Sequence, residues 1–167
     1  MRMKYQSPKT TCLICKSEYT GRGMARHIRS CLKRELGKRP VDQNKNLIHL
    51  HISGTYDPEY FLHLLVAGAA TLGDLDGYLR KIWLECCGHM SAFFEKSQLD
   101  ELDMRTRLQD AFIHNPVLMY EYDFGSTTEL TVRMLDQYPG IPGITNEFNL
   151  LSRNAPFDIP CDQCGKY

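Results

Sequence analysis

The sequence has no apolar segment long enough to cross a membrane as a helix. Its longest apolar run, residues 60–72, is interrupted by His63 and falls short of the roughly 20 residues that such a helix requires. The opening stretch, MRMKYQSPK, also lacks the apolar run of a signal peptide. We therefore expect a cytoplasmic protein with no membrane partner and with reduced cysteines.

Motifs that mark common catalytic sites are missing as well. There is no nucleophile elbow, no phosphate-binding glycine loop and no paired-carboxylate motif. His89, Tyr122 and Asp123 could form a polar cluster near a hairpin, but ionisable residues on a sheet more often serve structure. We expect a protein that is not an enzyme, and an enzyme with a pocket in the main domain is the alternative.

Net charge is also absent, but the zero sum hides an asymmetry. Residues 1–40 carry eleven Lys/Arg and two Asp/Glu, whereas the rest of the chain carries nine Lys/Arg and eighteen Asp/Glu. A basic N-terminal segment is thus joined to an acidic body. This polarity favours an anionic partner for the basic segment, unless the two parts simply attract each other.

The basic segment contains four residues with the spacing of a zinc site, Cys12-x2-Cys15-x11-His27-x3-Cys31. A Cys-x-x-Cys turn supplies two ligands to a tetrahedral zinc ion. His27 and Cys31 are four residues apart, so on a helix both point from one face toward that turn. The pattern predicts a bound Zn²⁺. The alternatives are a disulfide, which the expected reducing compartment disfavours, and idle thiols.

The spacing resembles the Cys-Cys-His-Cys variant of the ββα zinc finger, with one residue fewer between the second cysteine and the histidine. In such a finger we expect Tyr19 to provide the small core. Gly21 and Gly23 are expected in the turn before the helix.

The predicted finger helix has two distinct faces. Residues 24, 27, 28 and 31 cluster on the side that closes on zinc. Basic residues form a stripe on the opposite side: Arg22, Arg26, Arg29 and Lys33. Such a stripe suits contact with a nucleic acid. The alternatives are an adaptor whose finger binds an acidic protein, and an ordinary solvated face.

Four cysteines remain outside the finger, which is the number that a second tetrahedral site needs. They are Cys86, Cys87, Cys161 and Cys164. His89 could replace one of the two adjacent cysteines, because neighbouring ligands strain a tetrahedron. The other interpretation is that Cys86 and Cys87 are small core residues. One zinc ion is expected, and a second is left open.

The first part of the main domain reads as strand, strand and helix. Residues 47–53 alternate, with His49 and His51 on the face that we expect to be exposed rather than metal-binding. Residues 60–66 predict a buried strand. Thr71 and Asp74 predict the capping box of a helix whose apolar face includes residues 72, 75, 79, 82 and 83. Residues 89–94 predict a further strand.

The second part reads as a partly helical segment followed by a hairpin. Residues 96–115 keep a helical period at positions 104, 108, 111 and 112. Residues 117–124 and 127–135 then flank a predicted two-residue turn at Gly125 and Ser126. Residues 138–143 predict a loop, and residues 147–152 a last strand. We expect a finger (1–35), a linker (36–46), an α+β domain (47–155) and a C-terminal Cys-x-x-Cys knuckle (156–167).

Residues 47–152 resemble the plasmid pRiA4b ORF-three-like family. The likeness lies in the leucine-spaced helix at 72–79, Trp83, the segment from His89 to Phe93 and the YEYDFG sequence at 120–125. The resemblance implies an α+β fold with an antiparallel sheet packed on helices, in a mobile-element context and with no assigned activity. Many members continue with an acidic residue and a tryptophan after DFG, where this chain has residues 126–129, and many lack the finger.

Overall fold

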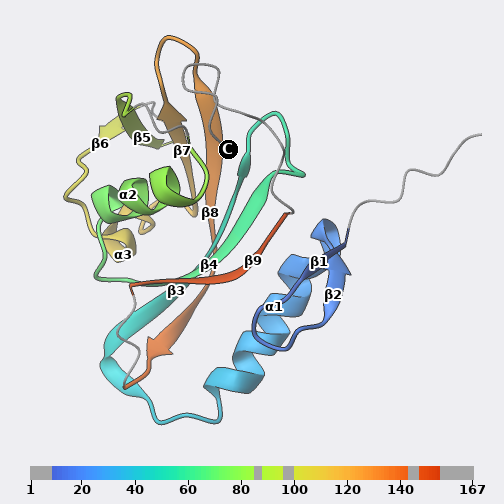
Figure 1. The fold of residues 1–167 in the computed structure, drawn as a ribbon. Helices are drawn as coiled ribbons and strands as arrows, with labels where there is room; N and C mark the ends of the chain where they lie inside the picture. Colours follow the sequence, from blue (N-terminus) through green and yellow to red (C-terminus); the bar gives the residue numbers. More distant parts are fainter. Residues whose placement is uncertain (1–8, 85–87, 96–99, 143–146, 155–167) are drawn as a thin grey trace, which may run out of the picture.

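The computed structural model describes residues 9–84, 88–95, 100–142 and 147–154. It shows a mixed α+β fold in which helices pack on an antiparallel sheet, which confirms the predicted fold class. Two helices lie on one face of the sheet, and a small N-terminal ββα finger lies on the other (Figure 1). The elements are β1 (Lys9–Thr11), β2 (Glu18–Thr20), α1 (Gly21–Leu36), β3 (Asp42–Gly54), β4 (Phe61–Ala67), α2 (Leu72–Ile82), β5 (Ser91–Glu95), β6 (Glu101–Leu102), α3 (Leu108–Ala111), β7 (Val117–Tyr122), β8 (Thr128–Gly140) and β9 (Phe148–Arg153).

The main sheet has seven strands in the order β6-β5-β7-β8-β3-β4-β9, and β1 pairs separately with β2. β3 and β8 are the longest strands, and they pair along most of their 13 residues each. β3 begins at Asp42, inside the segment that we expected as a linker. β8 continues to Gly140, so the loop predicted at residues 138–143 is in its first part a strand.

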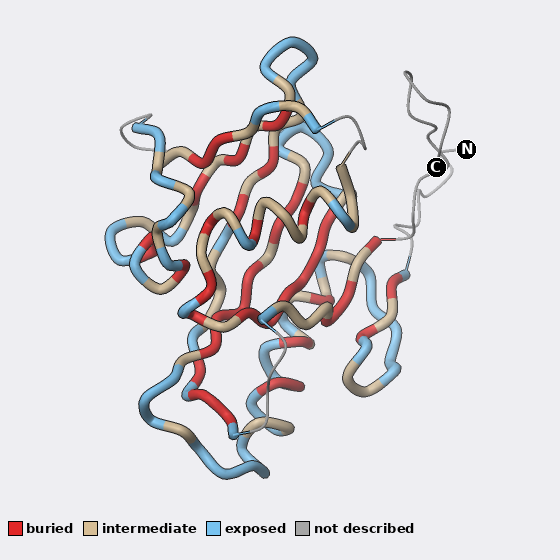
Figure 2. The backbone as a smooth tube through the Cα atoms, turned by 60° about the vertical axis from the view of Figure 1, so that its left-hand side comes forward, coloured by how far each residue is buried: buried red, intermediate tan, exposed pale blue. Residues whose placement is uncertain are grey.

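One face of the sheet packs against α2 and α3 to form the larger core. Leu72, Leu75 and Leu79 of α2 are fully buried in one cluster with apolar side chains of β3, β4, β5, β7 and β8. Figure 2 shows how buried stretches of the backbone alternate with accessible ones along the chain. The helix begins where predicted, because Thr71 Oγ1 accepts a hydrogen bond from the N–H of Asp74 and the Asp74 carboxylate accepts one from the N–H of Thr71.

The opposite face of the sheet is covered in part by the finger. Strand β4 is buried on both faces, which explains its continuous apolar sequence. The prediction that His49 lies on an exposed strand face is wrong, since His49 and His63 have no solvent exposure and only His51 is partly accessible. The sequence pattern identified the two faces but could not reveal that both are covered.

Two local predictions in the second half need correction. The segment expected to be partly helical, residues 96–115, is helical in its described part only at the single turn α3, and the short strand β6 precedes this turn. The hairpin connection spans residues 123–127 instead of two residues, since β7 ends at Tyr122 and β8 begins at Thr128. Asp123 has a φ of 57°, and its carboxylate accepts a hydrogen bond from the N–H of Gly125.

The last predicted strand is present as β9, which pairs with β4 at the end of the sheet. Among the helices that the structure describes, none has the length and apolar character needed to span a membrane.

Candidate metal centre

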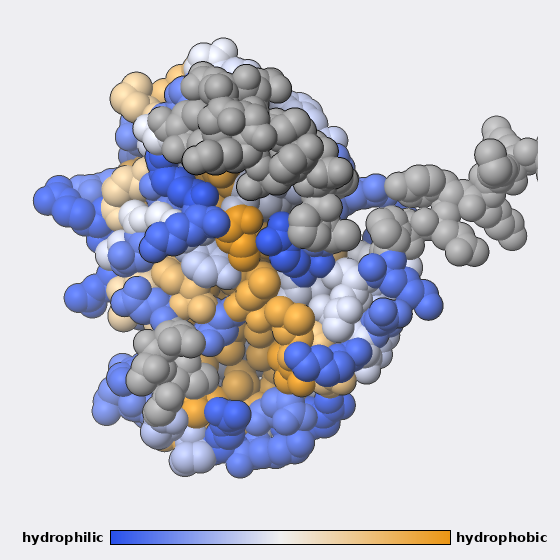
Figure 3. Space-filling view, in the orientation of Figure 1, coloured by the Kyte–Doolittle hydropathy of each residue, from blue (hydrophilic) through white to orange (hydrophobic). Residues whose placement is uncertain are grey.

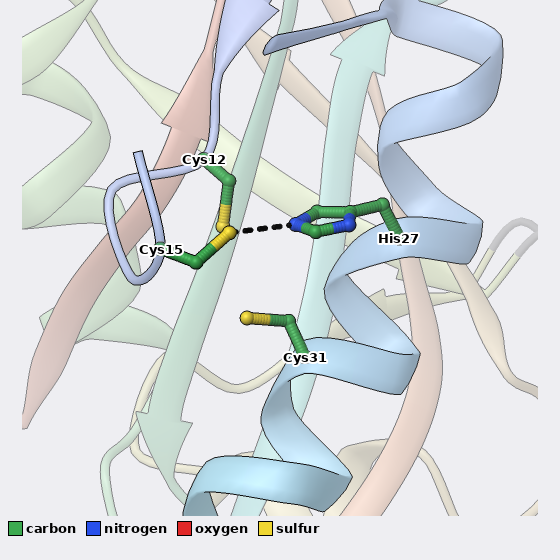
Figure 4. Close-up of side chains that lie close together, drawn as sticks. All are labelled: Cys12, Cys15, His27 and Cys31. Carbon is green, nitrogen blue, oxygen red and sulfur yellow. Dashed lines mark hydrogen bonds between the residues drawn. The ribbon is translucent and has the colours of Figure 1, made fainter. Parts of the chain in front are cut away.

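The four residues of the predicted zinc motif come together between the finger hairpin and α1. Cys12 and Cys15 lie in the connection between β1 and β2, and His27 and Cys31 lie one turn apart on α1 (Figure 4). Their ligand atoms are all within 4.8 Å of one another. This cluster can therefore hold a metal ion.

The backbone between the two finger strands forms a tight knuckle. β1 and β2 pair in register from Lys9↔Thr20 to Thr11↔Glu18. Between them, the N–H of Lys16 donates to the carbonyl of Cys12 at 2.8 Å, and Lys16 adopts a left-handed conformation with a φ of 64°. This turn brings the two sulfur atoms to the same side, as a Cys-x-x-Cys metal site requires.

The helix of the finger begins earlier than the sequence suggested. α1 starts at Gly21 with Thr20 as its N-cap, so Gly21 and Gly23 are helical residues rather than the turn before the helix. Gly21 is a point of close approach, because a Cβ at this position would lie 3.1 Å from Cε1 of Phe61 in β4. The start of α1 is therefore packed against the sheet.

The donors of the cluster differ in their surroundings. Cys12 and Cys31 are buried, whereas Cys15 is partly exposed and its Sγ lies 3.2 Å from Nε2 of His27. Burial raises the pKa of the Cys31 thiol to about 12, and hydrogen bonds with Ser17 lower the pKa of Cys15 to about 6. A bound cation would favour the thiolate at every one of these sulfurs.

Tyr19 does not form the core of the finger, contrary to the expectation from sequence. Its side chain is 37% exposed and stacks on the ring of His27, with the ring centroids 4.1 Å apart and an interplanar angle of 22°. The aromatic residue thus covers and orients a candidate ligand. Its position between the two ligand pairs correctly indicated that Tyr19 lies near the site, but not that its side chain is partly exposed and stacks on His27.

The interior of the finger is instead completed by the sheet. Met24, Ile28 and Leu32 of α1 are buried in a cluster with residues of β3, β4, β8, β9 and the segment after β8. The body contributes to this cluster Leu47, Leu65, Tyr138, Ile141 and Leu151. Figure 3 shows a band of hydrophobic residues down the middle of this side of the molecule, where the finger adjoins the body.

The predicted basic stripe divides into two parts in the structure. Arg22, Arg26 and Lys33 are exposed on α1. Arg29 is instead engaged with the body, because its guanidinium donates two hydrogen bonds to Asp136 of β8. Asp136 could not be identified as its partner from sequence, since 107 residues separate them.

The second set of cysteines, Cys86, Cys87, Cys161 and Cys164, lies outside the described residues, so that site stays a prediction. His89 lies within the described residues, beside Tyr122 and Asp123. Its backbone N–H donates to the hydroxyl of Tyr122 at 3.3 Å, and its ring Nδ1 lies 3.7 Å from Oδ1 of Asp123. The three residues of the suggested polar cluster therefore do meet.

The polar residues beside this group are occupied in holding α2 on the sheet. Asp76 accepts hydrogen bonds from Ser91, Tyr120 and Arg80 at 2.6, 2.7 and 2.8 Å. Burial raises the pKa of the Asp76 carboxyl, but these three donors outweigh it and lower the pKa overall. These hydrogen bonds tie α2 to β5 and β7.

A buried histidine group was missed by the sequence analysis. His49 Nε2 and His63 Nδ1 are 3.0 Å apart, and His51 lies against the His63 ring with the centroids 4.7 Å apart. The other ring nitrogens of the pair, His49 Nδ1 and His63 Nε2, are buried without hydrogen-bond partners in the described chain. Burial lowers the pKa of His49 and His51 to about 4, and it also holds the pKa of His63 well below its usual value.

Two hollows on the described surface lie away from the polar cluster. One, of about 440 Å³, is lined by residues 101–104. The other, of about 230 Å³, lies between β1 and the end of β9 and is lined by Lys9, Thr10, Thr11, Leu13, Arg153 and Asn154. Neither contains the His89 group or the Cys/His cluster.

Comparison with known proteins adds a fold relationship. No family model and no curated protein sequence matches the chain. Among solved structures, the fold is similar to that of MM3350 from Methanosarcina mazei Go1, a protein of unknown function. The two share 17% sequence identity with a TM-score of 0.54, over 73% of this chain and 75% of that chain. At this identity the similarity establishes a shared fold and does not extend to activity.

Proposed function

We propose that Cys12, Cys15, His27 and Cys31 bind one structural Zn²⁺ and that the chain is a zinc-dependent binding protein rather than an enzyme. The observation that carries this proposal is the convergence of four ligand atoms within 4.8 Å. Three thiolates and one imidazole form a donor set that zinc prefers, in the tetrahedral geometry typical of structural sites. Because all four positions are filled by the protein, no position remains for a substrate or a reactive water.

The role of this metal would be to fix the finger in the geometry that docks on the body. Among the described residues, the knuckle meets α1 at the Cys/His cluster and through the apolar residues that the finger shares with the sheet, and Tyr19 of β2 stacks on His27. Small zinc modules commonly need their metal to fold, because coordination supplies the free energy that a small core lacks. The reduced thiols that this requires fit the cytoplasmic location expected from the sequence.

The metal content of the purified full-length chain tests the proposal. We expect zinc by mass spectrometry of the wild type and the loss of one equivalent in Cys12→Ser and in Cys31→Ser. Cobalt exchange should give the intense visible bands of tetrahedral thiolate coordination. Ser30→Ala, at an exposed position of α1 outside the cluster, is the control and should keep all of its zinc, whereas Cys86→Ser and Cys161→Ser test the second cysteine set. Unchanged zinc in both finger variants would overturn the proposal.

A second candidate function, binding of a nucleic acid, is favoured by the exposed basic residues of α1. Arg22, Arg26 and Lys33 remain on the solvent side when the apolar side of the helix docks. In DNA-reading fingers the start of the helix contacts the bases, but here the start of α1 packs against Phe61. We therefore propose contact with phosphates and no reading of base sequence.

Binding to short duplex DNA and to RNA across a salt series tests this second candidate. Each phosphate contact contributes about 0.9 to the slope of log K against log salt for duplex DNA. We expect Arg22→Glu/Arg26→Glu to weaken binding strongly, and Lys81→Glu/Arg107→Glu, with the same change of charge on exposed residues elsewhere, to have a small effect. Equal losses in the two variants, or no binding at low salt, would reject it.

Membership of the pRiA4b ORF-three-like family is part of the same proposal and stays a prediction. It is supported by the leucine-spaced helix α2 and by the YEYDFG sequence, which ends β7 and begins the hairpin connection. It would connect the chain to a family without an assigned activity. The binding experiments above therefore do not depend on it.

A further inference from the structure

Strand β9 forms one end of the main sheet, and the finger covers its outer edge. The N–H of Leu13, in the knuckle, donates to the carbonyl of Leu151 at 2.8 Å. The hydroxyl of Thr10 in β1 donates to the carbonyl of Arg153 and contacts the Ser152 hydroxyl. The carbonyl groups of Leu151 and Arg153, on the side of β9 that faces away from β4, are thus hydrogen-bonded to the finger.

The strand itself has little protection against pairing with another strand. Its sequence, FNLLSR, contains a single charged residue and no proline. The opposite edge of the sheet differs, since β6 has only two residues, one of them Glu101, and Asp103 follows. Short length and charge are common means of preventing edge-to-edge association, whereas β9 has six residues and its one charge, Arg153, is at its last position.

The cover over this edge depends on the proposed metal. The finger has no buried apolar residue outside the cluster that it shares with the body, among the residues that the structure describes. Without a metal, the knuckle would be held on the body by the shared cluster and by the hydrogen bonds of Leu13 and Thr10 with β9, and α1 by the Arg29–Asp136 pair. The knuckle carries Leu13, so its unfolding would remove the donor that occupies Leu151.

We propose that the metal-loaded finger closes the β9 edge, and that loss of the metal opens it as a pairing site for β9 of a second copy of this chain. This inference rests on the proposed metal binding. Antiparallel pairing of two identical edges satisfies the outward backbone groups of both copies through a two-fold axis. It would also give the uncovered Leu151 an apolar partner.

The molar mass of the full-length chain in solution tests this proposal. Light scattering after size exclusion would be measured in reducing buffer on the zinc-loaded protein, after zinc removal with a chelator, and after zinc is restored. We expect the mass to double on removal and to return on restoration. A mass that does not change although zinc has left would overturn the proposal.

A proline variant distinguishes edge pairing from general aggregation. The carbonyl of Arg153 points outward, so its N–H also points outward, and Arg153→Pro should block edge pairing without disturbing the pairing with β4. Metal-free Arg153→Pro should keep the mass of the loaded form. The molar mass of Glu101→Pro, a substitution at the other edge of the sheet, should still double when zinc is removed. Doubling in Arg153→Pro would overturn the proposal.

Hydrogen exchange provides a readout that needs no variant. On zinc removal, amides of β1, β2 and α1 should lose protection. Amides of β9 should then gain protection as protein concentration rises, and loss of protection in β9 at all concentrations would contradict pairing. If the purified chain holds no zinc at all, the proposed function itself fails. If zinc leaves and β9 does not pair, only this inference fails.

Discussion

Arg29 of α1 holds both carboxylate oxygens of Asp136 in β8, with Nε 2.5 Å from Oδ2 and Nη2 3.1 Å from Oδ1. Burial alone would raise the pKa of Asp136, but the guanidinium overcomes this and holds that pKa below its usual value. A bidentate pair of this geometry fixes orientation as well as adding attraction. It joins the finger to the body at the edge of their shared apolar cluster.

Arg29→Ala should therefore weaken the docking of the finger. Because the arginine side chain is half exposed, we expect a modest fall in the melting temperature, of about 4 °C at most, and a smaller difference in 1 M salt. Arg26→Ala, which removes an exposed arginine from the same helix, is the matched control. Equal effects of the two substitutions in a thermal melt would show that the ion pair does not contribute.

Tyr19→Ala should reduce the affinity of the metal site without abolishing it. The stacked ring restricts the orientation of His27, and loss of an aromatic contact of this kind corresponds to about a two- to tenfold weaker affinity. Competition with a chromophoric chelator would measure the change. Tyr19→Phe keeps the ring and should bind metal like the wild type. An equal loss in Tyr19→Phe would point to the hydroxyl instead.

The buried histidines should make the protein less stable in acid. Burial lowers the pKa of His49 from 6.5 to about 4, so between these values the unfolded chain binds more protons than the folded chain. This contribution to the free energy of unfolding is complete above pH 6.5 and is lost as the pH falls toward 4. For His49 it amounts to about 3 kcal/mol.

Denaturation of His49→Gln across pH would isolate this effect. Wild type and variant share the same metal site, so acid release of the metal affects both. We expect the wild type to lose stability more steeply than the variant between pH 6.5 and 4. His114→Gln, at an exposed histidine, is the control and should follow the wild type. Parallel pH profiles of the wild type and His49→Gln would contradict the assignment.

Substitution by alanine should lower the stability of the protein at Gly140 and raise it at Gly77. At Gly140, a Cβ would lie 2.4 Å from Cβ of Lys45 and 3.0 Å from its carbonyl oxygen, so Gly140→Ala should cost about 1–3 kcal/mol of stability. At Gly77, inside α2, a Cβ would meet nothing within 4 Å. Gly77→Ala should stabilise by up to about 1 kcal/mol. Urea denaturation measures both, and a stable Gly140→Ala would show that the contact can relax.

The features that sequence predicted are those set by neighbouring residues. The capping box at Thr71 and Asp74 depends on a spacing of three residues, and the helix begins there. The alternation in β3 correctly separated Ile48 and Leu50 from the histidine face. The spacing of the finger ligands was sufficient to bring them together, because a knuckle and one helical turn set their geometry locally.

The features that sequence missed depend on contacts between distant segments. His49 looked exposed because nothing near it in sequence indicates that α1 covers its side of the sheet. Tyr19 looked like a core residue because an isolated finger needs one, whereas this finger takes its core from the body. Residues 138–140 looked like a loop, but β8 continues through Pro139 because Pro139 lies opposite Asn46 of β3, which is almost a hundred residues earlier in the sequence.

The cluster shared by the finger and the body also has a consequence for the order of folding. Its members extend from Cys12 to Leu151, so the first element of the chain completes its packing against the last strand described. Contacts with such sequence separation form late, because a long loop must be closed before they contribute. On the ribosome, the knuckle and α1 emerge early and can meet Leu47 and Leu65 once β3 and β4 have been made, but their apolar cluster is complete only after β9 has been synthesised. Complete docking of the finger therefore requires that β9, the last strand described, has been added to the sheet.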